Sequence, residues 1–216
     1  MEWFQTWSAD FCDTFTRCFI KDDRYMLLLD GIGVTIRVSL IAVLIGIAIG
    51  LLIALCNLSS NKLLKVIGGI YTDVIRGTPS VTQLMIIYFV IFASVNLSKW
   101  IIAAIAFGIN SGAYVSEIIR AGILSVDKGQ TEAGRSLGLS ASQTMTRIVI
   151  PQAVKNIFPA LCNEFIVLIK ETAIVGYVGL MDIQKAGDFI KSATFEAFMP
   201  LIGTAIIYYV LIKILT

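Results

Sequence analysis

The sequence predicts an all-α, polytopic membrane protein with five transmembrane helices. Its composition is the first reason: 57% of the residues are hydrophobic, only 15% are charged, and the mean hydropathy is +0.84, whereas soluble domains carry roughly 45–50% apolar and about 25% charged residues. The second reason is that several apolar runs reach the roughly 20 residues that a helix needs to cross a bilayer. The third is that these runs lack the sustained apolar–polar alternation of a membrane β-barrel.

The five predicted spans are residues 33–56, 63–95, 100–124, 148–169 and 198–215. The first contains Gly46 and Gly50 at GxxxG spacing, which either lets two helices approach closely or is incidental in a glycine-rich helix. The second is interrupted by Arg76-Gly77-Thr78-Pro79. Because proline removes a backbone donor and disfavours helix in the residue before it, we predict one crossing with a break in it.

The lysine and arginine residues predict the orientation. They are concentrated in and around the loop between the third and fourth spans, and such loops face the cytoplasm. An odd number of spans then leaves the N-terminus outside and the C-terminus inside. We therefore expect an extracytoplasmic segment over residues 1–30 and a transmembrane domain over residues 31–216, with a cytoplasmic loop at about 126–147. No cleavable signal peptide is expected, because the acidic N-terminal segment lacks a basic region followed by an apolar core.

Composition also excludes several function classes. A net charge of +2 is too small to suggest nucleic acid binding. The absence of histidine removes the commonest metal ligand and general base, and no glycine-rich nucleotide loop is present. We therefore expect neither an enzyme nor a cofactor in this chain. The four cysteines show no CxxC spacing, and a disulfide between Cys12 and Cys18 remains open.

The cytoplasmic loop is predicted to form two short helices. The first begins at Asp127, with Gln130 three residues later as in a capping box, and runs to Leu137. It ends at Gly138, because glycine is favoured in a left-handed helix cap. Ser140 and Gln143 then form a second Ser-x-x-Gln box. A short exposed helix suits a groove on a partner; the alternative is a solvated linker.

This loop resembles the cytoplasmic EAA loop of ABC importer permeases. Glu132-Ala133-Gly134 is followed by Gly138 at the family's spacing, and then by Ile148 and Pro151. Gly134 replaces the usual second alanine, which we expect to soften the helix. Four further motifs resemble the polar amino acid permease subfamily, in the same order and at matching distances: residues 28–36, 71–79 with Gln83 and Tyr88, 112–122 and 163–174.

The resemblance implies the fold of a type I ABC importer permease in a bacterial plasma membrane. It further implies a second permease, identical or homologous, two ATPase subunits that bind ATP and magnesium, and an extracytoplasmic binding protein that delivers an amino acid. Under this resemblance the residues that dock the ATPase are Glu132, Ala133, Gly134, Arg135, Ser136 and Gly138.

Polar residues inside the spans indicate a transport pathway, because such residues are costly in a bilayer. By helix rise, Asn110 and Ser111 lie about 15 Å deep and Glu164 about 20 Å from the opposite end. Glu171 lies seven residues beyond Glu164, on the same helix face. The predicted substrate-binding residues are Thr78, Asn110, Ser111, Glu164 and Glu171. Two acids on one face favour a cationic cargo, such as arginine, lysine or histidine.

Alternatives remain at this point. Asn110 and Ser111 serve equally well as interhelical hydrogen-bonding residues, and Glu164 has Arg76 at the helix break as a rival partner. Glu117 and Arg120, three residues apart, are expected to form a structural pair. The cargo alternatives within the family are glutamine, glutamate or cystine. A small dimeric secondary amino acid transporter is the alternative outside it, although such transporters usually show internal repeats.

Overall fold

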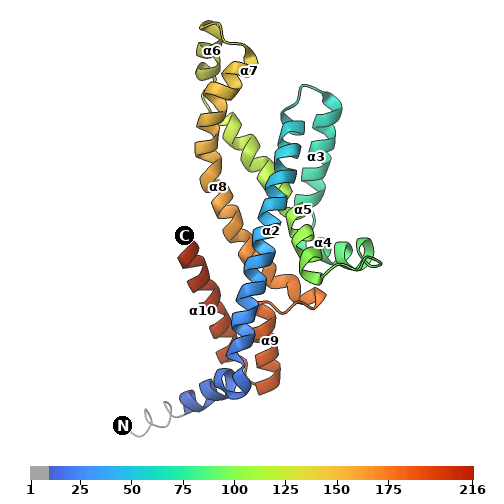
Figure 1. Cartoon of the computed structure of the whole chain (residues 1–216), viewed down its shortest axis with the longest axis vertical. Coiled ribbons are helices and arrows are strands. Elements are labelled where there is room, and N and C mark those ends of the chain that lie inside the picture. The colour runs from blue at the N-terminus through green and yellow to red at the C-terminus, as the bar shows by residue number, and fades with distance from the viewer. Residues whose placement is uncertain (1–9) are drawn as a thin grey trace. The chain divides into compact units, whose positions relative to one another are not determined.

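The computed structural model describes residues 10–216, and every regular element in that part of the chain is helical (Figure 1). The α-helices are α2 (Tyr25–Leu58), α3 (Lys62–Arg76), α4 (Ser80–Ile86), α5 (Lys99–Leu124), α6 (Lys128–Ser136), α7 (Ala141–Thr144), α8 (Ile150–Glu171), α9 (Ile183–Thr194) and α10 (Phe198–Leu215). Shorter π-helical segments cover Thr16–Ile20, Ile87–Ile91 and Met145–Val149, and 3-10 segments cover Lys21–Asp23 and Thr172–Val178. The predicted all-α class is confirmed.

Three helices among the described residues, α2, α5 and α10, are long and apolar enough to cross a membrane. The broken pair of α3 with Ser80–Ile91, bent by 104° at the break, gives a fourth candidate. The 22 residues of α8 are long enough for a fifth crossing, but this helix carries Lys155, Glu164, Lys170 and Glu171. The count of five is therefore compatible with the helix lengths and is not established by them.

The chain divides into two compact units. The terminal unit contains the described part of Met1–Ser39, together with Leu84–Ala103 and Ile169–Thr216. The central unit contains Leu40–Gln83 and Ala104–Leu168. The loop at 126–147, called the coupling loop below after the role that the resemblance implies, belongs to the central unit, as do four of the five predicted substrate residues.

Glycines bring α2 and α5 together in the central unit. A Cβ atom placed on Gly50 would lie 2.5 Å from Val115 Cγ1, and one on Gly112 would lie 2.8 Å from Ile49 Cγ2. Gly108 is equally tight against Ile45, at 2.5 Å. No larger side chain fits at these contacts without displacing its neighbour. Of the two interpretations of the GxxxG spacing, the structure supports close helix approach.

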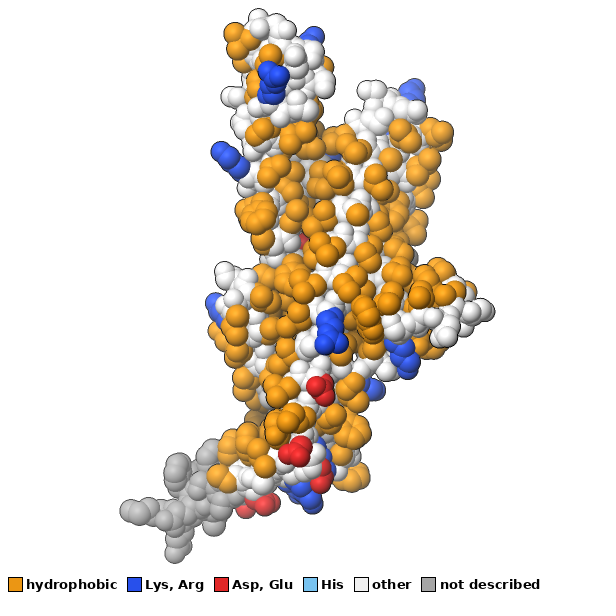
Figure 2. All heavy atoms as spheres, in the orientation of Figure 1, with side chains coloured by type: hydrophobic (Ala, Val, Ile, Leu, Met, Phe, Trp, Pro, Cys, Tyr) orange, Lys and Arg blue, Asp and Glu red, His pale blue; other side chains and the backbone are white. Residues whose placement is uncertain are grey.

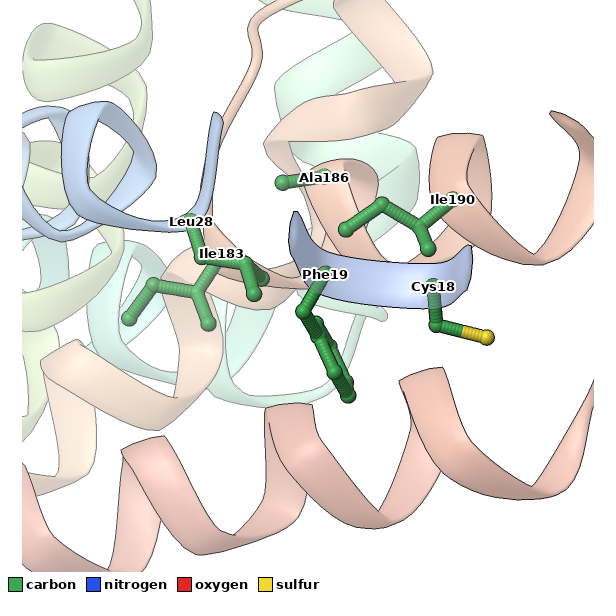
Figure 3. Packing of buried hydrophobic residues seen from close by; sticks show 6 residues of the cluster. All are labelled: Cys18, Phe19, Leu28, Ile183, Ala186 and Ile190. Atoms are coloured by element: carbon green, nitrogen blue, oxygen red, sulfur yellow. The ribbon is translucent and has the colours of Figure 1, made fainter. Parts of the chain in front are cut away.

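The terminal unit is built around α9. Its Ile183, Ala186 and Ile190 side chains pack with Phe19 and Leu28, as Figure 3 shows. Asp182 is fully buried and caps α9 by accepting from the backbone N–H groups of Gln184 and Lys185, at 3.3 and 2.9 Å. Burial raises the pKa of the Asp182 carboxyl, and these hydrogen bonds partly oppose that shift.

Cysteines in the described residues are all free. Cys12 is exposed, whereas Cys18 is buried and lies 3.9 Å from the hydroxyl of Thr194. The structure therefore does not join the two residues for which a disulfide was left open.

Hydrophobic side chains cover most of the face drawn in Figure 2. On α2 alone, Leu44, Leu52 and Leu55 are 66%, 63% and 57% exposed. Soluble monomers rarely expose continuous apolar surface on this scale. Such a surface is consistent with a multi-pass membrane protein whose apolar helices face lipid.

Candidate functional site

Helix caps hold the loop that was predicted to be cytoplasmic, and they lie at the positions that the sequence predicts. The Asp127 carboxylate accepts from the N–H of Gly129 at 2.6 Å and starts α6. Gly138 has φ of +83°, so the chain leaves α6 through the left-handed region that favours glycine. Ser140 and Gln143 form a reciprocal capping box that starts α7, with bonds of 2.8 and 3.2 Å.

Gly134 is the contact point between α6 and the helix that follows the loop. It is buried, and a Cβ atom there would lie 2.8 Å from both Thr144 Cγ2 and Ile148 Cδ1. From the sequence we expected Gly134 to soften α6, and we did not predict this contact. Alanine at this position would push the two helices apart, so glycine here fits a closely packed corner.

The other predicted docking residues point outward. Glu132, Ala133, Arg135, Ser136 and Gly138 are all exposed. Leu137, which the sequence analysis did not select, is 82% exposed directly before the left-handed corner. The sequence could have indicated Leu137 as well. Gly138 marks a helix end, and Leu137 is the apolar residue directly before it in an otherwise polar loop.

A polar layer crosses the central unit at the middle of α5; we define it as Gln83, Asn110, Ser111 and Glu164. Ser111 donates its hydroxyl to Glu164 Oε1 at 2.7 Å, and Asn110 donates Nδ2 to Gln83 Oε1 at 2.9 Å. All four side chains are buried, with Glu164 8% exposed. The structure therefore joins two of the predicted substrate residues, Ser111 and Glu164, and pairs a third, Asn110, with Gln83.

Gln83 also holds the break in the second span. Its Nε2 donates to the carbonyl of Ile75 at 2.7 Å and to Thr78 Oγ1 at 2.6 Å. These bonds satisfy groups that the end of α3 leaves without helical partners. Thr78 itself is exposed and donates to the carbonyl of Val74 at 2.8 Å, so it contacts the layer only through Gln83.

Arg76 does not pair with Glu164. Its guanidinium carbon lies 5.4 Å from the ring centre of Tyr114, a cation–π distance. The rival partner considered for Glu164 is thus engaged elsewhere, and Ser111 is the partner that Glu164 has. Glu117 and Arg120 form the expected pair at 2.7 Å.

A pocket of about 510 Å³ lies between the end of α2, α3 and the end of α5. Its charged lining residues are Lys65, Asp73, Arg76, Glu117 and Arg120. None of the five predicted substrate residues lines it. Glu171, the fifth of these, is the last residue of α8 and belongs to the terminal unit, so the polar layer is defined without it.

Metal binding finds no support in the described residues, where no group of three or more cysteine or acidic side chains is placed to hold an ion.

Comparison with known proteins matches residues 46–216 to the model of the family described as "Binding-protein-dependent transport system inner membrane component". A putative glutamine transport system permease protein of Rickettsia bellii (strain RML369-C) is 43% identical over 195 residues, covering 89% of each chain. The arginine transport system permease protein of Bacillus subtilis (strain 168) is 42% identical over 191 residues, covering 88% of this chain and 87% of its own.

A solved structure has the same fold. The crystal structure described as "an amino acid ABC transporter with histidines" superposes with a TM-score of 0.84 at 44% identity, over 91% of this chain and 93% of that chain.

Proposed function

The chain belongs to the family of binding-protein-dependent transport system inner membrane components, and we propose that it imports polar amino acids bearing a cationic group. In this proposal a separate ATPase supplies the energy and binds the ATP and magnesium. A binding protein on the outer side delivers the cargo, and a second permease, identical or homologous, completes the pathway. The N-terminus faces outward and the C-terminus faces the cytoplasm.

The observation that carries the proposal is the coupling loop, residues 126–147. Its two capped helices meet at Gly138, and Gly134 packs their junction tightly. Glu132, Arg135 and Leu137 are exposed on the outward side, and Leu137 is 82% exposed. A polar helix with one exposed apolar side chain suits a groove on a soluble partner. If each permease docks one ATPase subunit, two permeases would bind two of them.

The buried carboxylate of Glu164 supports the cationic cargo. Its one side-chain partner among the described residues is a neutral hydroxyl, and no arginine or lysine there forms an ion pair with it. A carboxylate in an apolar span is costly unless it is neutralised, and a cationic cargo would supply the missing charge.

Glutamine is the second candidate cargo. The polar layer offers Asn110 as well as Glu164, and a side-chain carboxamide could bond to both without carrying a charge. The Rickettsia relative is named for glutamine and the Bacillus relative for arginine, so relatives of similar identity bear the names of both cargo classes.

Uptake into proteoliposomes tests the proposal. The permease is purified with the ATPase and binding protein encoded beside it, and ATP-dependent uptake of labelled arginine, lysine, glutamine and cystine is measured. The control complex carries an ATPase that cannot hydrolyse ATP. We expect uptake of arginine or lysine that requires ATP. Uptake of glutamine alone would replace the cationic cargo, and ATP-independent uptake of any amino acid would contradict an ATP-driven importer.

A further inference from the structure

Helix α3 has two exposed faces of opposite character. The charged face carries Lys65, Asp73 and Arg76, all of them exposed. The opposite face is apolar, and its side chains are 51–67% exposed: Leu63, Val66, Ile67, Ile70 and Val74. Both sets recur at helical spacing, so each face is continuous along α3. The apolar face suits lipid, whereas charged residues in a spanning helix turn towards protein or a water-filled cavity.

The charged face of α3 lines the pocket of about 510 Å³, whose lining residues all belong to the central unit. Glu117 and Arg120 of α5 supply the other charged wall. The pocket reaches Leu124, the last residue of α5, two positions before the coupling loop. It therefore lies at the helix ends that are predicted to face the cytoplasm. Its volume is within the range of about 300–1,000 Å³ that small-molecule sites have.

The charges in this pocket are only partly neutralised. Glu117 and Arg120 form an ion pair at 2.7 Å. Among the described residues, the side chains of Lys65, Asp73 and Arg76 form no ion pair and no hydrogen bond. A purely anionic ligand would be repelled by Asp73, and a purely cationic ligand would be repelled by Lys65 and Arg76. A ligand that carries one group of each sign suits this arrangement.

We propose that this pocket binds the α-carboxylate and α-ammonium groups that amino acids share. Lys65 and Arg76 hold the carboxylate, which a guanidinium can bind through two parallel hydrogen bonds, and Asp73 holds the ammonium. No residue of the polar layer lines the pocket, so this is a second amino acid site.

The pocket is placed to hold cargo on the exit side. Glu117 follows Ser111 of the polar layer by six residues on α5, which is about 9 Å along the helix towards the coupling loop. Cargo that leaves the polar layer for the cytoplasm would pass this pocket. The inference rests on the proposed function, which supplies the amino acid and the direction of transport.

Protection of a cysteine from a thiol reagent tests the pocket directly. Gly69 lines it and has nothing within 4 Å of its Cβ position, so Gly69→Cys adds a thiol without a clash. The variant is made in a background without the native cysteines. Its nucleotide-free complex with the ATPase is placed in phosphatidylcholine nanodiscs, where the reagent reaches both sides. Ser60→Cys is the control, because Ser60 is exposed and adjacent to the lining residue Ser59 but does not line the pocket.

Alanine is the probe, since the α groups are its only polar groups. We expect alanine at ten times its Kd to slow the labelling of Gly69→Cys about tenfold and to leave Ser60→Cys unchanged. Ethylamine lacks the carboxylate and propionate lacks the ammonium, so neither should protect at the same concentration. No protection by alanine, or equal protection by either single ion, would overturn the proposal.

Two further substitutions in Gly69→Cys identify the binding groups. We expect Arg76→Gln and Asp73→Asn each to raise the protecting alanine concentration about tenfold or more, as for the loss of one hydrogen bond to a charged group. Lys62→Gln removes an exposed lysine of α3 that does not line the pocket, and it should change nothing. If Arg76→Gln and Asp73→Asn lower the melting temperature but leave the protecting concentration unchanged, the two residues are structural and the proposal is wrong.

Three results keep the test decisive. If Gly69→Cys does not assemble, Ser59→Cys serves instead, because Ser59 also lines the pocket. Slow labelling in nanodiscs that contain phosphatidylethanolamine but no alanine would assign the pocket to a lipid headgroup and overturn the proposal. Normal ATP-driven uptake without alanine protection would refute this site alone, whereas absent uptake by the wild-type complex would refute the proposed function.

Discussion

At the scale of the residue, the main feature of the central unit is the buried carboxyl group of Glu164. It is 8% exposed, and it accepts one hydrogen bond of 2.7 Å from Ser111. A hydroxyl donor stabilises a buried anion less than an ion pair does, because no opposite charge is present. If Glu164 binds cargo as proposed, a cationic ligand would supply the opposite charge that this hydrogen bond does not.

Glu164→Gln tests this role. Glutamine keeps the size and can still accept from Ser111, but it removes the charge. We expect uptake of arginine or lysine to fall about tenfold to a hundredfold, as for the loss of one charged hydrogen bond, while the melting temperature of the complex is unchanged or raised. The measurement is proteoliposome uptake together with thermal unfolding, with Glu196→Gln as a control outside the central unit. Unchanged uptake of basic amino acids with a lower melting temperature would make Glu164 structural.

The sequence identified Asn110, Ser111 and Glu164 because polar residues in an apolar helix are rare and costly. It did not identify which of them touch. Ser111 and Glu164 are 53 positions apart, and only the packing of α5 against α8 joins them. Gln83 stood out in the sequence only through motif resemblance, since its role depends on the direction in which its carboxamide points.

At the scale of the element, close packing between α2 and α5 depends on glycine. Gly50 lies against Val115, and Gly112 lies against Ile49. Without a hydrophobic driving force inside a bilayer, helices associate through such close van der Waals contact. Gly33 on the same helix α2 has nothing within 4 Å of its Cβ position, so it provides a matched comparison.

Gly50→Ala should destabilise the protein, and Gly33→Ala should not. Both changes raise helix propensity, but only the first adds an atom 2.5 Å from Val115 Cγ1, at an expected cost of about 1–3 kcal/mol for overpacking. Thermal unfolding of the detergent-purified variants, followed by size-exclusion chromatography, gives the comparison. Equal melting temperatures for the two variants would show that α2 and α5 are not in the close contact described.

Helix ends were the most predictable elements. Asp127, Gly138, Ser140 and Gln143 all act as their local sequence predicts, because caps involve neighbours within a few residues. The helix α9 was not predicted, although Asp182 caps it and Ile183, Ala186 and Ile190 recur at helical spacing on its buried face. The search for long apolar spans passed over this short amphipathic helix.

Orientation in the bilayer is a property of the whole molecule, and thiol labelling tests it. Ser60, Ser142 and Ser192 are exposed. In a background without the native cysteines, we expect cysteines at 60 and 142 to react with an impermeant reagent only after the cytoplasmic side is opened. A cysteine at 192 should react in intact cells. The opposite pattern would invert the model and place the coupling loop outside.

Glu164 and the second half of the coupling loop lie on one continuous stretch of helix in the central unit. The chain is helical from α7 at Ala141, through Met145–Val149, into α8 with Glu164. A displacement of the loop by a partner can thus be carried along this stretch to the polar layer. We expect cargo to move only when a partner ATPase acts on that loop.

Gly138→Val tests this expectation, because valine is strained at φ of +83° and nothing within 4 Å of its Cβ position would otherwise be disturbed. ATP-driven amino acid uptake is measured alongside co-purification of the ATPase. We expect the variant to insert normally, to retain less ATPase and to lose uptake by about tenfold or more. Wild-type uptake with full ATPase co-purification by Gly138→Val would show that this loop does not couple an ATPase to transport.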